Sequence, residues 1–177
     1  MIIMGMSGAG AVTRLLMGSA SRRVIEQAQC PVLLMPSDFK FSEIRKIALA
    51  SDLGKADLEV IHSLTALAAQ FEADLVITHV TDDFQDTAEH QKKSEAFLRE
   101  VTNKINYNRI YYRHVKNADI DQGLDWLAEN GKIDLMAMVH HQKGLLSRII
   151  SGSHTKSLLG HIGIPLLVFP AGKHFTF

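Results

Sequence analysis

The stretch GMSGAGAVTRLLMGS, from Gly5 to Ser19, spaces its glycines in a way that could hold a ligand. Glycines stand at Gly5, Gly8, Gly10 and Gly18, and Ser19 is a residue suited to begin a helix. Glycines before a helix start leave free N–H groups and the positive end of the helix dipole, an arrangement that binds phosphate. Glycines that only form a turn and a close contact between helix and strand explain the same cluster, so both interpretations stay open.

The chain repeats itself when it is shifted by 134 residues. The identical pairs include Gly10 and Gly144, Gly18 and Gly152, Ser19 and Ser153, Pro31 and Pro165, and Leu33 and Leu167. This ungapped agreement extends over residues 1–36 and is difficult to obtain from composition alone. We therefore expect residues 1–36 to be the carboxyl-terminal part of a first domain, residues 37–42 a linker, and residues 43–177 a complete second domain. Met1 is then expected to be an internal methionine of a longer tandem protein.

Residues 43–177 alternate between strand patterns and helix patterns. Apolar runs predict strands at 44–51, 74–80, 109–115, 134–139 and 165–169. Amphipathic runs predict helices at 56–73, 82–105, 119–131 and from residue 153 onward. Strands that are apolar enough for burial on both faces, and that alternate with helices, indicate a parallel sheet covered on both sides. Ligands of such sheets bind beyond the carboxyl ends of the strands, where the strand order reverses.

The composition argues against several classes of partner. Nineteen Lys and Arg residues balance nineteen Asp and Glu residues, so no overall field favours nucleic acid or an anionic membrane. No apolar run has the length of a membrane span, and the amino terminus lacks the pattern of a secretory signal. Cys30 is the single cysteine, which leaves no internal disulfide. We expect a cytoplasmic protein with neither nucleic acid nor membrane as its partner.

The glycine pattern, two residues between Gly5 and Gly8 and nine more before Gly18-Ser19, resembles the nucleotide-binding pattern of the universal stress protein family. The later copy resembles the family along its length, from IALASDLG with Asp52 through DLVITHV and DLMAMV to PLLVF. The resemblance implies an α/β fold whose five-stranded parallel sheet has the order 3-2-1-4-5 and carries helices on both faces. Residues 1–36 would add a β-α-β remnant of a sister domain. By analogy with tandem members, the strand at 32–35 should lie antiparallel beside that at 166–169.

The same resemblance implies ATP or a related adenine nucleotide as the ligand. The residues carried over are Gly5, Gly8, Gly18 and Ser19 for the phosphate loop of the first copy, Asp52 for ribose or metal, Val80 for adenine, and Gly152 and Ser153 for the loop of the second copy. Neither copy holds a complete set. The first copy lacks the acid, and the second has Val139 and Gln142 where glycines are expected, side chains that would narrow the approach of a triphosphate.

These features predict a stress-response sensor or scaffold that binds nucleotide and acts through dimerisation. The dimer is expected to form through the last strands and through the unpaired apolar edge at residues 1–5. No Lys-Ser or Lys-Thr pair follows the glycines, so we expect no metabolic enzyme, no catalytic residue and at most weak ATP hydrolysis.

Two alternatives remain for the function. One is an interaction module that has lost its ligand. The other is a metal site of His79, His140 and His141, a set of three that would suit zinc. Adjacent residues of an extended segment point opposite ways, which argues against His140 and His141 binding together. His90 has no clustered partner in the sequence.

Overall fold

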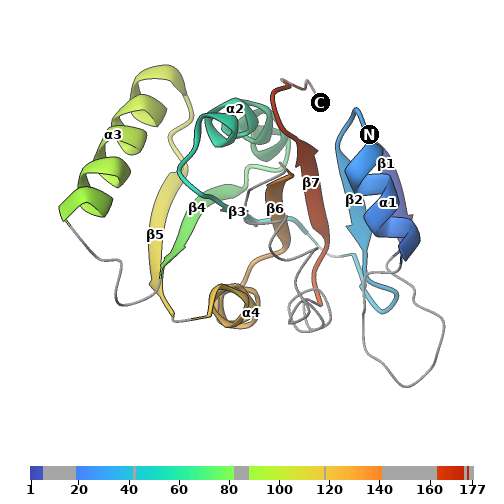
Figure 1. The fold of residues 1–177 in the computed structure, drawn as a ribbon. Helices are drawn as coiled ribbons and strands as arrows, with labels where there is room; N and C mark the ends of the chain where they lie inside the picture. The colour runs from blue at the N-terminus through green and yellow to red at the C-terminus, as the bar shows by residue number, and fades with distance from the viewer. Residues whose placement is uncertain are drawn as a thin grey trace.

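The computed structural model describes residues 1–5, 19–41, 43–81, 88–117, 119–140, 163–173 and 175. These residues form seven strands and four helices, which Figure 1 shows as a sheet with helices on both sides. The strands are β1 (Ile2–Gly5), β2 (Val32–Met35), β3 (Lys46–Ala50), β4 (Asp74–Thr81), β5 (Ile110–Lys116), β6 (Leu135–His140) and β7 (Leu166–Pro170). The helices are α1 (Ser19–Gln27), α2 (Lys55–Gln70), α3 (Ala88–Lys104) and α4 (Ile120–Asn130).

A single sheet contains all seven of these strands, in the order β1-β2-β7-β6-β3-β4-β5. Neighbouring strands are parallel except β2 and β7, which pair antiparallel with Leu33 opposite Leu167. The predicted antiparallel pairing of these two strands is therefore confirmed. The predicted five-stranded sheet is wrong in strand number, because β1 and β2 extend the same sheet.

The order of the whole sheet consequently differs from the predicted 3-2-1-4-5. The five strands that follow residue 43 keep that order among themselves, since they run β5-β4-β3-β6-β7. The difference comes from the β1-α1-β2 segment, which docks along β7 and satisfies backbone groups that an edge strand would leave unpaired. Because β2 is antiparallel to β7, β1 and β2 point opposite to the other five strands.

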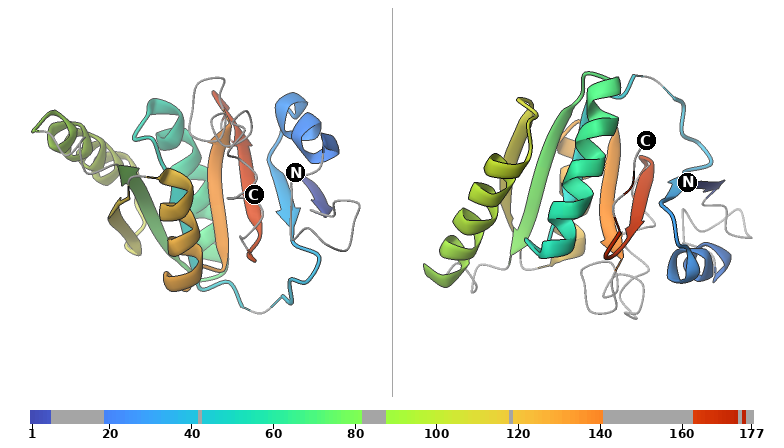
Figure 2. Two further views of the ribbon diagram at one scale, coloured as in Figure 1. Left: turned by 60° about the horizontal axis from the view of Figure 1, so that its bottom comes forward. Right: turned by 90° about the horizontal axis from the view of Figure 1, so that it is seen from above.

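Two hydrophobic cores lie on opposite faces of the sheet. Figure 2 shows the sheet and its helices from two further directions. Side chains alternate along β3, so Ala48 packs into the core that holds Ile25 of α1 and Leu124 of α4. Leu49 packs into the other core, with residues of α2 and α3. The prediction that the central strands are buried on both faces is confirmed.

The helices begin and end close to their predicted bounds where the structure describes them. Helix α2 ends at Gln70, with Phe71 as its C-cap, and Glu72 has a φ of 51°, a left-handed conformation in which the helix does not continue. Phe71, which lies within the helix predicted at 56–73, is 39% exposed. Among the described residues no helix is long and apolar enough to cross a membrane. The helix predicted from residue 153 lies outside them.

Candidate functional site

Strand β3 lies where the strand order reverses. The chain continues from β3 to β4 and β5 on one side, and returns to β6 and β7 on the other. The last residue of β3, Ala50, pairs with Thr78 of β4 and Met138 of β6, so these strands finish at one edge of the sheet, which we call the carboxyl edge. Sheets of this kind bind ligands beyond that edge, beside the reversal.

A buried hydrogen-bond network fixes the loop that follows β3. The Ser51 hydroxyl donates to Asp57 Oδ2 at 2.7 Å and accepts the Leu53 N–H at 2.9 Å. Asp57 Oδ2 also accepts the Gly54 N–H at 3.1 Å, as the third residue of α2 in a capping arrangement. Leu53 has a φ of 57°, and this network holds it in that uncommon left-handed conformation. The direction in which the loop leaves the sheet is therefore fixed.

Asp57 is the buried acid of this network, with 3% of its surface exposed. Burial raises the pKa of Asp57, and the hydrogen bonds from Ser51 and Gly54 partly oppose this shift because they stabilise the carboxylate. Sequence reasoning placed Asp57 in a helix but assigned it no contact. The signal that could have found it is a glycine N-cap followed three residues later by an acid, Gly54 to Asp57.

Asp52 lies just beyond the end of β3 at the carboxyl edge, as its place after the predicted strand implies, and it is half-buried. Its main-chain carbonyl accepts a hydrogen bond from Lys93 Nζ of α3 at 2.8 Å. The loop is thus held from two directions, by Asp57 of α2 and by Lys93 of α3.

Val80 is the next-to-last residue of β4 and is 5% exposed. Its side chain packs against α4, where a Cβ added to Gly123 would stand 2.7 Å from Val80 Cγ1. The side chain therefore belongs to the core. Val139 of β6 is likewise buried, in the core on the α2 side, so its side chain does not narrow the carboxyl edge as expected.

Gly5 and Asp52 do not share a site. Gly5 ends β1, which is separated from β3 by β2, β7 and β6, a distance of roughly 19 Å at the usual spacing of strands. Because β1 runs opposite to β3, Gly5 also lies toward the other edge of the sheet. Ser19 is the first residue of α1, and Gly8, Gly18, Gly152, Ser153 and Gln142 lie outside the described residues.

The three histidines considered for a metal do not converge in the described structure. His79 lies on the face of β4 toward α3, whereas His140 follows the buried Val139 and so faces the opposite side. His141 lies outside the described residues. Within the part of the chain that the structure describes, no three His, Cys, Asp or Glu side chains are arranged to hold a metal ion.

His79 instead meets two histidines that sequence reasoning did not connect with it. Its ring is stacked with His90 at 5.6 Å and with His114 at 6.2 Å between ring centroids. The expectation that His90 has no clustered partner is therefore wrong. His79 and His114 occupy paired positions on neighbouring strands, so their side chains lie on the same face of the sheet. The predicted strands at 74–80 and 109–115 could therefore have indicated this part of the cluster.

A hollow of about 930 Å³ lies at the opposite edge, where β3, β4 and β6 begin. Several of its charged groups are engaged locally: Arg45 pairs with Glu43, Arg109 pairs with Asp74, and Asp134 accepts the Lys46 N–H. The carboxyl edge is the better candidate, because parallel sheets bind ligands there and the loop at Asp52 is held in place.

Several solved proteins share this fold. A solved universal stress protein from Archaeoglobus fulgidus DSM 4304 has a TM-score of 0.66 at 20% identity, covering 97% of this chain and 61% of that chain. A functionally unknown protein from Pseudomonas aeruginosa PAO1 has a TM-score of 0.66 at 16% identity, covering 96% and 62%. A universal stress protein solved in complex with cAMP has a TM-score of 0.57 at 17% identity, covering 74% and 100%. No curated protein matches the chain significantly.

Because these sequence identities are low, the structural likeness establishes the fold alone. The chain spans about three fifths of the first two structures that it matches, 61% and 62% of their lengths. The sequence profile of the universal stress protein family matches residues 1–36 and 43–170, which is nearly the whole chain. The chain belongs to the universal stress protein family.

Proposed function

We propose that this chain binds an adenine nucleotide at the carboxyl edge around Asp52 and acts in a stress response as a sensor or scaffold. The observation that carries the proposal is the placement of Asp52 at the reversal of strand order, in a loop that Asp57 and Lys93 hold in position. The universal stress protein solved with cAMP supports the class of ligand, since it has the same fold.

The described residues fit the sugar side of such a ligand. The Asp52 carboxylate is suited to accept hydrogen bonds from ribose hydroxyls, and the nearby Lys93 ammonium favours an anionic ligand. Val80 marks the end of the neighbouring strand, where the base is proposed to lie. The proposed phosphate residues Gly152 and Ser153 lie outside the described part of the chain.

The mechanism that we propose is a coupling between ligand binding and assembly. A ligand that binds the folded chain stabilises it by RT ln(1 + [L]/Kd), which is about 2.7 kcal/mol at a hundredfold excess over Kd. Partners would then respond to the stabilised arrangement. The proposal assigns no catalytic residue and expects at most weak ATP hydrolysis.

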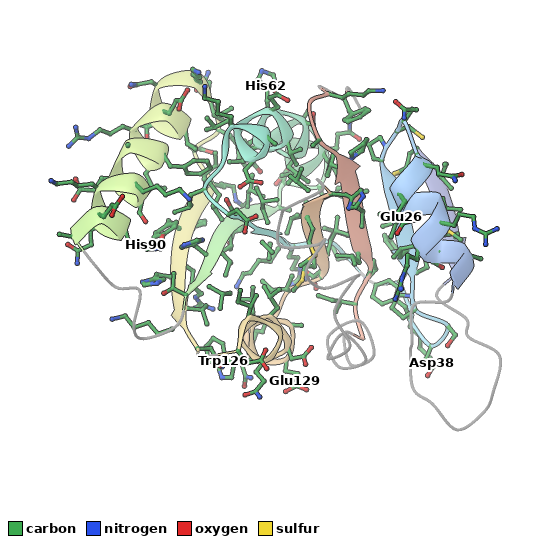
Figure 3. The ribbon with its side chains drawn as sticks, in the orientation of Figure 1. Glu26, Asp38, His62, His90, Trp126 and Glu129 are labelled. Atoms are coloured by element: carbon green, nitrogen blue, oxygen red, sulfur yellow. The ribbon has the colours of Figure 1, made fainter. Side chains whose placement is uncertain are left out.

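Thermal unfolding with and without ATP or cAMP tests this proposal. We expect each nucleotide that binds to raise the melting temperature of the wild-type chain, and Asp52→Ala to abolish the increase. Asp38→Asn is the matched control, because Asp38 is an exposed acid that Figure 3 shows across the molecule from His90 of α3. No increase with either nucleotide would remove the nucleotide from the proposal, and an equal increase in Asp52→Ala would place binding elsewhere.

A second candidate function is an interaction module that works without a ligand. Strand β1 is an edge strand of the sheet, and Ile3 on it is 63% exposed. Beside it lies an apolar pocket of about 220 Å³ to which Leu33 and Met35 contribute, and Phe41 at its rim is 68% exposed. Because β2 and β7 have partners on both of their edges, we place the proposed dimer at β1.

A further inference from the structure

Three histidines from three elements meet between α3 and the sheet. His79 comes from β4, His114 from the neighbouring position of β5, and His90 from the first turn of α3, which Figure 3 shows beside the strands. They border a pocket of about 250 Å³. We call His79, His90 and His114 the histidine cluster.

His79 is held in one neutral form. Its Nδ1 lies 2.7 Å from the Ser51 carbonyl oxygen, which can only accept, so Nδ1 carries the proton. Nε2 is then the only nitrogen that can gain a proton. It is fully buried, and no described residue provides it with a hydrogen-bond partner. Protonation of His79 would therefore create a buried cation, in a side chain only 7% exposed, with a new N–H that no described group accepts.

The groups around His79 are mostly basic. His90 and Lys93 come from α3. Glu95 of the same helix also lines the pocket, but it is exposed, and its Oε2 lies 3.8 Å from a guanidinium nitrogen of Arg99. From β5 come Tyr112 and His114, whose Nε2 lies 2.6 Å from the Thr81 hydroxyl.

Asp52 comes from the loop after β3, and Asp57 comes from the first turn of α2, where it is hydrogen-bonded to Ser51 and Gly54. Burial lowers the pKa of His79, and the positive charges of His90, Lys93 and His114 lower it further, against the opposing effect of the Ser51 hydrogen bond. The neutral ring is thus the form that the folded chain requires.

The cluster is connected to the loop at Asp52 by two contacts. His79 donates to the carbonyl of Ser51, the residue before Asp52, and Lys93 donates to the carbonyl of Asp52 itself. Helix α3 has two buried residues, Phe97 and Val101, and both lie in its second half. Its first turns are therefore held mainly by the His90 stack and by the hydrogen bonds of Lys93 and Ser94.

We propose that the histidine cluster is a pH-sensitive contact that holds the first turns of α3 and the loop at residues 51–54 on the sheet at neutral pH and releases them on acidification. Among the described residues, no three His, Cys, Asp or Glu side chains are arranged to bind one metal ion, so the cluster is better suited to bind protons than a metal. Release of Lys93 would remove one of the two contacts that hold the loop carrying Asp52, and would leave the network of Asp57 in place. The effect on nucleotide binding rests on the proposed function, whereas the release itself does not.

Hydrogen exchange measured by mass spectrometry, without nucleotide, tests the release. After correction for intrinsic rates, peptides covering residues 88–94 and 51–54 should exchange about tenfold faster for each pH unit below about 6.5, if one proton is taken up on opening. Peptides of β7 and α4 should keep their protection. Unchanged protection of α3, or loss of protection in all segments together, would overturn the proposal.

The variant His79→Asn keeps an N–H donor in reach of the Ser51 carbonyl but does not titrate. It should remove the acid-dependent increase in exchange, and His62→Gln, at an exposed histidine of α2, should retain it. Retention of the full increase in His79→Asn would refute the role of His79. If that variant does not fold, titration of the wild-type histidine rings by NMR decides, because a His79 pKa at or above 6.5 would contradict the proposal. Failure of nucleotide binding alone would leave the exchange result standing.

Discussion

Leu33 and Leu167 lie opposite each other on β2 and β7, and they also occupy the same position of the two repeated segments. On either side of this pair, Val32 lies opposite Val168 and Leu34 lies opposite Leu166, so each of these two β2 residues faces the repeat equivalent of the other. A local two-fold axis therefore passes between the two leucines. Each copy contributes one strand to this junction, so residues 32–35 belong to the interior of the sheet.

Leu34 tests whether the first segment is part of the main core. It is fully buried in the cluster that also contains Leu124 and Met136. Leu34→Ala removes apolar contacts and leaves a cavity, so we expect a loss of about 2–5 kcal/mol in the free energy of unfolding. Urea denaturation followed by circular dichroism measures this loss, as one transition displaced to lower urea concentration.

The matched control is Leu33→Ala, because Leu33 is only half-buried and should cost less. If Leu34→Ala instead produced a separate early transition and left the main one unchanged, the first segment would unfold independently of the core.

Ile3 tests the proposed dimer at β1. If a second copy covers this residue, Ile3→Lys replaces a buried apolar contact with a charge at the interface. Burial of an isoleucine contributes about 1.5–3 kcal/mol, so the dissociation constant should rise by a factor of about ten to more than a hundred. Native mass spectrometry over a concentration series measures this change.

The control for this variant is Glu26→Lys, which adds a cation on the exposed surface of α1 in the same segment. Dimerisation should be preserved in that variant. A wild-type chain that stays monomeric at high concentration would rule out the dimer, and an Ile3→Lys variant that dimerises normally would move the interface away from β1.

Much of the fold could be predicted because local patterns determine it. The apolar run at 74–80 and the amphipathic run at 119–131 correspond closely to β4 and α4. The pairing of β2 with β7 was anticipated from the repeat and the family resemblance. The continuous seven-stranded sheet was not, because a local pattern does not specify which edge a strand extends.

Only those parts of the candidate site that depend on the position of a residue after a strand could be predicted from the sequence. Asp52 comes directly after the strand predicted at 44–51, and its place at the carboxyl edge, two residues beyond the end of β3, follows from that position. The contacts of Ser51 with Asp57 and with His79 join residues 6 and 28 positions apart, and they depend on the start of α2 and the register of β4. Sequence periodicity carries no information on either of these.

Asp57 should show an unusual dependence of stability on pH. Burial raises the pKa of Asp57 in the folded chain above the ordinary 3.8. At pH values between 3.8 and the raised pKa, the folded chain therefore binds more protons than the unfolded chain. The stability contributed by this group therefore falls as the pH rises through that range. Asp57→Asn does not titrate, so the unfolding free energy of wild type minus that of the variant should decrease with pH and then level off.

Urea denaturation of both chains at several pH values from about 3.5 upward measures this difference. Asp57→Ala serves as the comparison, since it removes the acceptor for Ser51 and Gly54 and should cost about 1–2 kcal/mol at neutral pH. A difference that grows with rising pH would show that the carboxylate is stabilised in the folded chain, contrary to this account.

Gly123 tests the contact between α4 and β4. A Cβ at this position would stand 2.7 Å from Val80 Cγ1 and 3.3 Å from Asn117 Cβ, so Gly123→Ala forces a shift in the core. Overpacking of this kind costs about 1–3 kcal/mol, and the better helix propensity of alanine returns up to about 1 kcal/mol. We expect a net loss in urea denaturation, whereas Gly163→Ala, with nothing within 4 Å, should change little.

The decisive measurement is Gly123→Ala in a Val80→Ala background. Removal of the valine methyl groups opens the space that the new Cβ needs, so the second substitution should make the first less costly. Equal costs in the two backgrounds would show that α4 does not pack on Val80. Because Val80 lies near the end of the strand beside β3, that result would also change the shape of the candidate site. A lower cost of Gly123→Ala in the Val80→Ala background would show that α4 packs on β4 there and supports the site.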